Sequence, residues 1–131
     1  MLVGGRDFVK AARRWRKMLG GGMRQAGIIA AAGRYALANN ISRLADDHAN
    51  ASRLAAGLAK HAYLKVAPAV TNMVFVVVPD KIAAPFTAHL LKDGVRPYGT
   101  ARHRWVTHLD VSTADVDAAV ASVDRFFKEH H

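Results

Sequence analysis

Apolar residues in the first half of the chain recur at helical spacing. Residues 6–18 carry them at the i, i+3, i+4 and i+7 positions with basic residues between, which predicts an amphipathic helix. Residues 23–37 are rich in alanine and glycine, so we expect a second helix that is buried and closely packed by neighbours. A third helix is predicted over 42–61, with Asp47 on its outer face and an inner stripe at Leu44, His48, Ala51, Ala55 and Leu58.

The periodicity changes in the second half. Residues 73–78 form a β-branched run between turn formers, which predicts a well-buried strand. Ser112 and Asp115 have the spacing of a capping box and indicate where the last helix begins. The other predicted elements are a helix over 81–92 and short strands over 95–98 and 102–109. The chain is therefore expected to be α+β, with a helical first half followed by a small C-terminal domain whose short, mainly antiparallel sheet is packed by helices.

Composition places the chain among globular proteins. It has 131 residues, of which 51% are hydrophobic and 22% charged, enough for one ordinary domain with a core. No uncharged apolar run approaches the roughly 18 residues of a membrane span, and the first residues do not have the pattern of a secretory signal. The absence of cysteine excludes disulfides and thiol chemistry, and we expect a cytoplasmic protein.

The net charge of +9 is the most unusual bulk property. Nineteen basic residues face ten acidic ones. Such an excess of positive charge is compatible with binding to nucleic acid, to an anionic cofactor or to an acidic partner domain, or with a solvated surface. The composition does not distinguish these four explanations. Seven of the basic residues lie within the first 24 positions: Arg6, Lys10, Arg13, Arg14, Arg16, Lys17 and Arg24.

Few residues have the pattern of a catalytic or metal site. The chain has no nucleophile elbow, P-loop or dinucleotide fingerprint, and its histidines lack the spacing of metal ligands. The terminal pair His130–His131 is given no function. Gly20–Gly22 before a predicted helix is compatible with an anion cradle or simply with a turn. Arg24 falls in the first turn of that helix, where the helix dipole disfavours a cation, so a ligand or partner explains it better.

Arg104 lies in the middle of the strand predicted over 102–109. On that strand it shares a face with Arg102, whereas Trp105 lies on the opposite face. An arginine in a half-buried strand needs a partner, and its planar fork suits a carboxylate held by two parallel hydrogen bonds. The partner is either an anionic ligand or an acidic residue in a structural salt bridge, and the residue pattern leaves both open.

Several longer motifs occur in series. The segments 14–27 (RWRKMLGGGMRQAG) and 104–110 (RWVTHLD) resemble patterned segments of low-specificity L-threonine aldolases. Residues 71–75 (TNMVF) and 44–50 (LADDHAN) resemble the same family. The resemblance covers nearly the whole chain in matching order and spacing, which makes it far more specific than any single short motif.

The resemblance implies a pyridoxal phosphate enzyme of the aspartate aminotransferase fold type that cleaves L-threonine or L-allo-threonine to glycine and acetaldehyde. It assigns residues 1–40 to the end of the large cofactor domain and the interdomain helices, and 41–131 to the small C-terminal domain. The family's cofactor lysine lies in a Ser-Lys-Gly-like context before the matching segment, so this chain is expected to contribute no catalytic residue and to be inactive alone. The lysines that do not match this context are Lys10, Lys17, Lys60, Lys65, Lys81, Lys92 and Lys128.

The resemblance also implies roles for individual residues. Arg104 matches the arginine that holds the substrate α-carboxylate, and Arg24 and Lys17 match basic residues that reach the cofactor phosphate or its waters. Trp15 and Met23 are interpreted as packing residues, as is Trp105. The implied partners are an amino acid substrate, the N-terminal cofactor domain and further copies in a dimer or homotetramer, and neither a membrane nor nucleic acid is expected. The alternative is a basic binding module derived from the aldolase half, which would bind nucleic acid in a salt-sensitive way.

Overall fold

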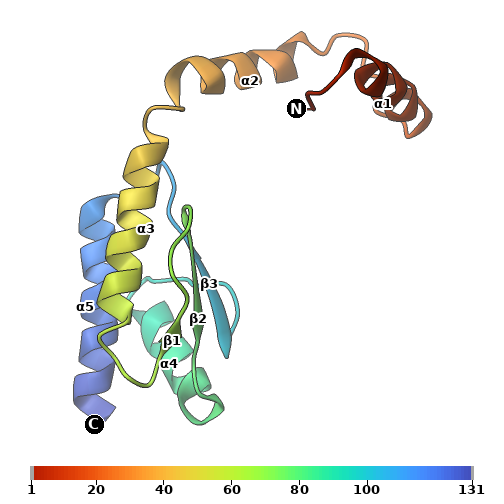
Figure 1. Cartoon of the computed structure of the whole chain (residues 1–131). Helices are drawn as coiled ribbons and strands as arrows, with labels where there is room; N and C mark the ends of the chain where they lie inside the picture. The colour runs from red at the N-terminus through yellow and green to blue at the C-terminus, as the bar shows by residue number, and fades with distance from the viewer. Residues whose placement is uncertain (1, 131) are drawn as a thin grey trace. The chain divides into compact units, whose positions relative to one another are not determined.

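The computed structural model describes residues 2–130. These form two compact units, and the boundary between them along the chain lies between Ser42 and Arg43. Each unit is described by itself. His131, the second residue of the terminal histidine pair, lies outside the described residues. Figure 1 shows the elements in chain order.

The first unit contains two helices, α1 (Arg6–Met18) and α2 (Gly27–Asn39). The bounds predicted for α1 are confirmed, whereas α2 begins four residues later than predicted. Neither helix contains a buried residue, and Ile28 of α2 is 81% exposed. Within the first unit α1 does not cover α2, so the burial and close packing predicted for α2 are not met there. Trp15 and Met23 are likewise exposed, so their interpretation as packing residues is not met within this unit.

The glycine triplet ends α1. Gly20 has φ of 84°, a left-handed conformation that favours glycine. Its N–H donates to the carbonyl of Lys17 at 3.2 Å, and the N–H of Gly21 donates to the carbonyl of Arg16 at 2.8 Å. These two bonds form a Schellman motif, which satisfies carbonyls that the end of a helix leaves free. The glycines are explained by the turn, and the anion cradle does not form because α2 begins only at Gly27.

The second unit is built on a three-stranded antiparallel sheet with the order β1-β2-β3. Its strands are β1 (Lys65–Val66), β2 (Met73–Val77) and β3 (Arg102–Val106). The sequence did not predict β1, which is only two residues long and too short to show a period. The strand predicted over 95–98 is reduced to a single bridge between Tyr98 and Arg104, partly because Pro97 has no N–H to donate.

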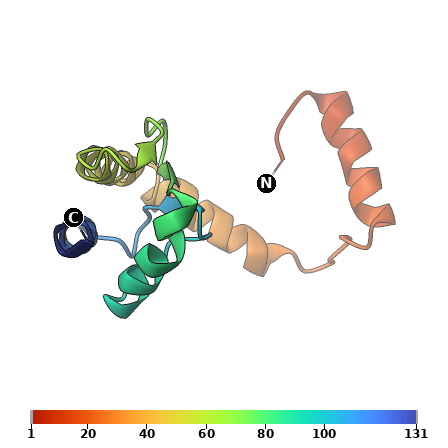
Figure 2. The ribbon, with the colours of Figure 1, turned by 90° about the horizontal axis from the view of Figure 1, so that it is seen from below.

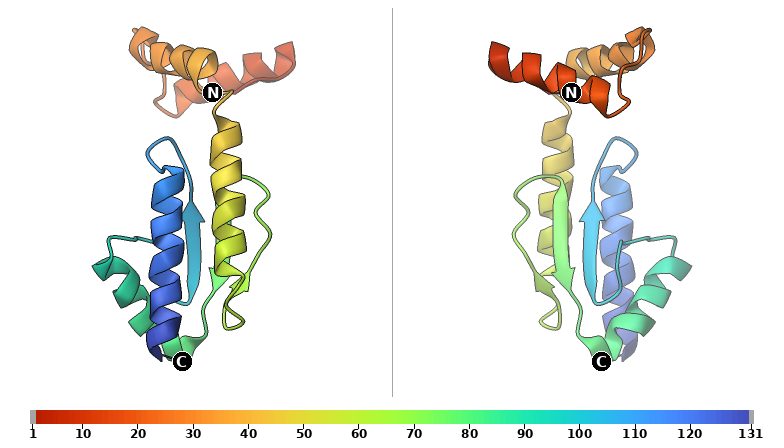
Figure 3. Two further views of the ribbon diagram at one scale, coloured as in Figure 1. Left: turned by 90° about the vertical axis from the view of Figure 1, so that its left-hand side faces the viewer. Right: turned by 90° about the vertical axis from the view of Figure 1, so that its right-hand side faces the viewer.

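Three helices cover one face of this sheet. They are α3 (Leu44–Leu58), α4 (Asp80–Lys92) and α5 (Thr113–His130). Figure 3 shows α3 and α5 in front of the strands in one view and behind them in the other. Seen from below, α3 and α5 are nearly end-on and α4 crosses at an angle (Figure 2). The α+β prediction with an antiparallel sheet packed by helices is confirmed.

The core lies between the sheet and these helices. Val74 and Val76 of β2 are buried there, but Phe75 between them is 52% exposed. The prediction of a well-buried strand therefore holds for one face only, because α3, α4 and α5 cover that face and alternate side chains point to the other. The largest hydrophobic side chains that are fully buried in the core are Phe86, Phe126, Leu58 and Leu90.

The inner face of α3 differs from the predicted stripe. Leu44 and His48 are exposed, whereas Asp47 is buried. Arg43 holds both carboxylate oxygens of Asp47 at 2.9 and 3.1 Å, which compensates the cost of burying the charge. The helical pattern placed Asp47 on the outer face of α3, because such a pattern does not show that an ion pair with Arg43 allows this carboxylate to lie on the inner face.

The predicted capping box at the start of α5 is confirmed. The backbone N–H of Ser112 donates to the Asp115 carboxylate at 2.8 Å, and the N–H of Asp115 donates to the Ser112 hydroxyl at 3.2 Å. The hydroxyl of Ser112 also donates to Asp115, and these bonds lower the pKa of the Asp115 carboxyl.

Candidate functional site

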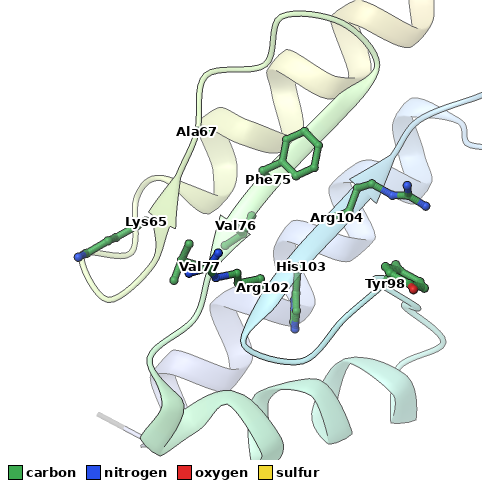
Figure 4. A pocket seen from close by; sticks show the side chains of 9 residues that line it. All are labelled: Lys65, Ala67, Phe75, Val76, Val77, Tyr98, Arg102, His103 and Arg104. Atoms are coloured by element: carbon green, nitrogen blue, oxygen red, sulfur yellow. The ribbon is translucent and has the colours of Figure 1, made fainter.

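The face of the sheet opposite α3, α4 and α5 carries a hollow of about 460 Å³. Figure 4 shows the side chains around it. Among its lining residues are three basic side chains, Lys65, Arg102 and Arg104, and two aromatic ones, Phe75 and Tyr98, and no acidic residue belongs to the lining. A concave surface with several cations and aromatic rings is suited to a small anionic ligand.

Arg104 is placed on this face by the alternation of β3. Its neighbours His103 and Trp105 point into the core, so the side chain of Arg104 points away from the helices. Its guanidinium carbon lies 5.1 Å from the centre of the Tyr98 ring. Among residues 2–130, no carboxylate forms an ion pair with Arg104. The structural salt bridge considered for Arg104 is therefore absent from the described part of the chain, and its donors are available to a ligand.

The buried neighbours of Arg104 are core residues. Trp105 is 6% exposed, which confirms its interpretation as a packing residue. The ring of His103 stacks on Phe86 with 5.7 Å between ring centres, and its Nε2 lies 3.1 Å from the hydroxyl of Thr87. Burial lowers the pKa of His103, which favours its neutral form. His103 therefore adds no positive charge to the site at neutral pH.

The other two candidate residues belong to the first unit. Lys17 lies in the last turn of α1, and Arg24 lies between the two helices, both with exposed side chains. The prediction that Arg24 falls in the first turn of α2 was wrong, because this helix begins at Gly27. The helix-dipole argument for a ligand at Arg24 therefore no longer applies. Of the three candidate residues, Arg104 alone belongs to the second unit, which carries the hollow.

Three of the charged or aromatic lining residues were not singled out from the sequence. Phe75 is paired directly with Arg104 across β2 and β3, and Tyr98 is paired with Arg104 on the other side. These pairs could have been found only from the strand register. Lys65 lies on β1, the strand that gave no signal in the sequence.

Comparison with known proteins decides the family. Residues 1–81 match the sequence profile described as beta-eliminating lyase. The chain belongs to the beta-eliminating lyase family. This chain is 48% identical over 127 residues to the low-specificity L-threonine aldolase of Escherichia coli K12, and the alignment covers 97% of this chain and 38% of that relative. It is 38% identical over 134 residues to a probable low-specificity L-threonine aldolase 2 of Arabidopsis thaliana, again over 97% and 38% of the two chains.

The resemblance to low-specificity L-threonine aldolases is thus confirmed, and the chain spans about 38% of the length of these relatives. Within residues 2–130, no helix combines the length and the apolar character needed to cross a membrane.

Proposed function

We propose that this chain forms part of a low-specificity L-threonine aldolase and that Arg104 binds the α-carboxylate of its amino acid substrate. The observation that carries the proposal is the position of Arg104 on the sheet face opposite the helices, in a hollow that Arg102 and Lys65 also line, without an acidic partner among residues 2–130. The similarity to relatives named threonine aldolases supplies the reaction. The sheet supplies a rigid base for the arginine.

A carboxylate held by Arg104 is fixed in orientation as well as in place. The guanidinium donates two parallel hydrogen bonds to the two carboxylate oxygens, which fixes the plane of the carboxylate and, once the amino group is also held, limits rotation about Cα. The Cα–Cβ bond that breaks in the aldol cleavage can then be held in one orientation throughout the reaction. Positioning of this kind contributes several kcal/mol to catalysis in oriented reactions.

The cofactor proposed for the complete enzyme is pyridoxal phosphate. Its phosphate is anionic, and the exposed cations of Lys17 and Arg24 fit that charge, since neither forms an ion pair within residues 2–130. When bound, the cofactor supplies an electron sink for the carbanion that the cleavage leaves on Cα. We propose that the lysine that carries it lies in the part of the relatives that this chain does not span, so that the chain alone is inactive.

The assembly proposed for the enzyme is a homo-oligomer, a dimer or tetramer. Both helices of the first unit expose large apolar side chains, which normally indicates a surface that another chain or domain covers. The exposed residues are Phe8, Trp15, Met18, Ile28, Ile29, Tyr35 and Leu37. We propose that the cofactor domain, with residues 1–40 at its end, and the other subunits cover this surface.

The test uses a completed enzyme, in which residues 1–131 replace the matching part of the Escherichia coli aldolase. Arg104→Ala should lower kcat/KM for L-threonine by about 30- to 1000-fold, corresponding to the roughly 2–4 kcal/mol of a lost charge-assisted bidentate contact. Arg102→Ala is the comparison, because Arg102 lines the same hollow but is not proposed to bind the carboxylate, so its effect should be smaller than that of Arg104→Ala. A loss below about tenfold for Arg104→Ala would assign this arginine a structural role.

A further inference from the structure

We propose that Tyr98 is a positioning residue for substrate binding, whose ring holds the Arg104 guanidinium in the orientation that receives the substrate carboxylate. This inference rests on the proposed function of Arg104. It concerns a residue that lies outside every strand and helix of the second unit and has no role in the core.

Arg104 lies in the middle of a row of three residues across the open sheet face. Phe75 is its direct neighbour on β2, and Tyr98 is its direct neighbour on the outer side of β3. The backbones of Tyr98 and Arg104 exchange two hydrogen bonds, of 2.8 and 3.1 Å. Of the two flanking rings, only that of Tyr98 lies within cation–π distance of the guanidinium, at 5.1 Å, and Figure 4 shows the two side chains next to each other.

The type of contact matters for the function. A cation–π contact restrains the long arginine side chain but uses none of its five N–H donors. An ion pair with an acidic side chain would restrain the arginine equally well, but it would occupy the donors that a substrate carboxylate needs. The Tyr98 ring therefore limits the motion of Arg104 and leaves its binding edge free.

The backbone turn after Tyr98 sets which residue lies opposite Arg104. The next residue, Gly99, has φ of 102°, and a Cβ at this position would overlap the carbonyl oxygen of Arg102. The turn back into β3 is therefore restricted to glycine and sets the register of Tyr98 against Arg104. The Tyr98 side chain itself is 74% exposed, so burial in the core does not explain its presence.

The test compares three variants of the completed enzyme. Tyr98→Leu removes the aromatic face and should raise KM for L-threonine about 3- to 10-fold with little change in kcat. Tyr98→Phe keeps the ring without the hydroxyl and should restore KM to within about twofold of the unmodified enzyme. Phe75→Leu removes the other ring that flanks Arg104, which makes no cation–π contact with it, and should raise KM less than Tyr98→Leu does.

A second measurement shows whether Tyr98 acts through Arg104. In an Arg104→Ala background, Tyr98→Leu should have no further effect on KM. In the unmodified 131-residue chain, the ring of Tyr98 should shift the NMR signals of the Arg104 side-chain protons upfield, and this shift should persist in Tyr98→Phe and vanish in Tyr98→Leu.

The outcomes separate this inference from the proposed function. An unchanged KM in Tyr98→Leu, together with a large effect of Arg104→Ala, overturns the role of Tyr98 and leaves Arg104 as the carboxylate-binding residue. A KM that still rises in the Arg104→Ala background overturns it as well, because Tyr98 would then act by another route. An Arg104→Ala variant of normal activity contradicts the proposed function itself.

Discussion

Gly57 of α3 lies against Val120 of α5, and its replacement by alanine should destabilise the second unit. A Cβ on Gly57 would lie 2.5 Å from Cγ2 and 2.9 Å from Cγ1 of Val120. Carbon atoms in contact prefer about 3.5–4.0 Å, so the helices would have to separate by about 1 Å. Rotation of the valine cannot fully remove the overlap, because its own Cβ lies only 3.3 Å away.

Two opposing effects determine the magnitude. Alanine is favoured over glycine in a helix by about 1 kcal/mol, whereas overpacking of a close contact costs about 1–3 kcal/mol. With about 2 kcal/mol for the overlap, Gly57→Ala should lower the free energy of unfolding by about 1 kcal/mol. In a Val120→Ala background both Cγ atoms are gone, and the same substitution should instead stabilise by up to about 1 kcal/mol.

The assay is urea unfolding followed by the fluorescence of buried Trp105, with Trp15 replaced by phenylalanine so that only the second unit reports. The four variants of a double-mutant cycle should give a coupling of about 2 kcal/mol between Gly57 and Val120. A stabilising Gly57→Ala in the presence of Val120 would refute the close approach of the two helices.

Three further predictions concern the same unit. Ser112→Ala should lower the free energy of unfolding by about 1 kcal/mol, because it removes the capping hydroxyl that binds the N–H of Asp115, and urea unfolding measures this. Thr107→Val should cost about 1 kcal/mol in the same assay, because it removes the buried hydrogen bond of 2.7 Å that the Thr107 hydroxyl donates to the carbonyl of Asp47. Burial lowers the pKa of His103 from 6.5, so the folded state binds a proton at this residue less readily than the unfolded state. The free energy of unfolding should therefore fall as the pH drops below about 6.5. His103→Gln should reduce this acid dependence, which the urea midpoint measured at several pH values shows.

The elements predicted correctly from the sequence are those with a regular repeat over many residues or with a signal confined to a few neighbouring residues. The helix over 6–18 and the capping box at Ser112 depend only on residues within a few positions of each other, and both agree with the structure. Asp47 and Phe75 were placed wrongly, because an ion pair buries the first and an uncovered sheet face exposes the second. Neither effect is visible without knowledge of what packs against the element.

The candidate site was predicted only in part. The alternation of residues on β3 was enough to separate Arg104 from the core face, and the structure confirms that separation. Its pairing with Tyr98 depends on strand register and on the turn at Gly99, which a linear pattern does not determine. The roles of Lys17 and Arg24 at the cofactor phosphate remain predictions.

The most direct test of the account asks whether Arg104 recognises a carboxylate. Glycine and glycinamide differ at this group, so their inhibition of L-threonine cleavage by the completed enzyme can be compared before and after Arg104→Ala. The account predicts that the unmodified enzyme binds glycine about 30-fold or more tightly than glycinamide, corresponding to roughly 2 kcal/mol, and that Arg104→Ala abolishes the difference. If the preference for glycine survives in Arg104→Ala, another group binds the carboxylate and the central claim is contradicted.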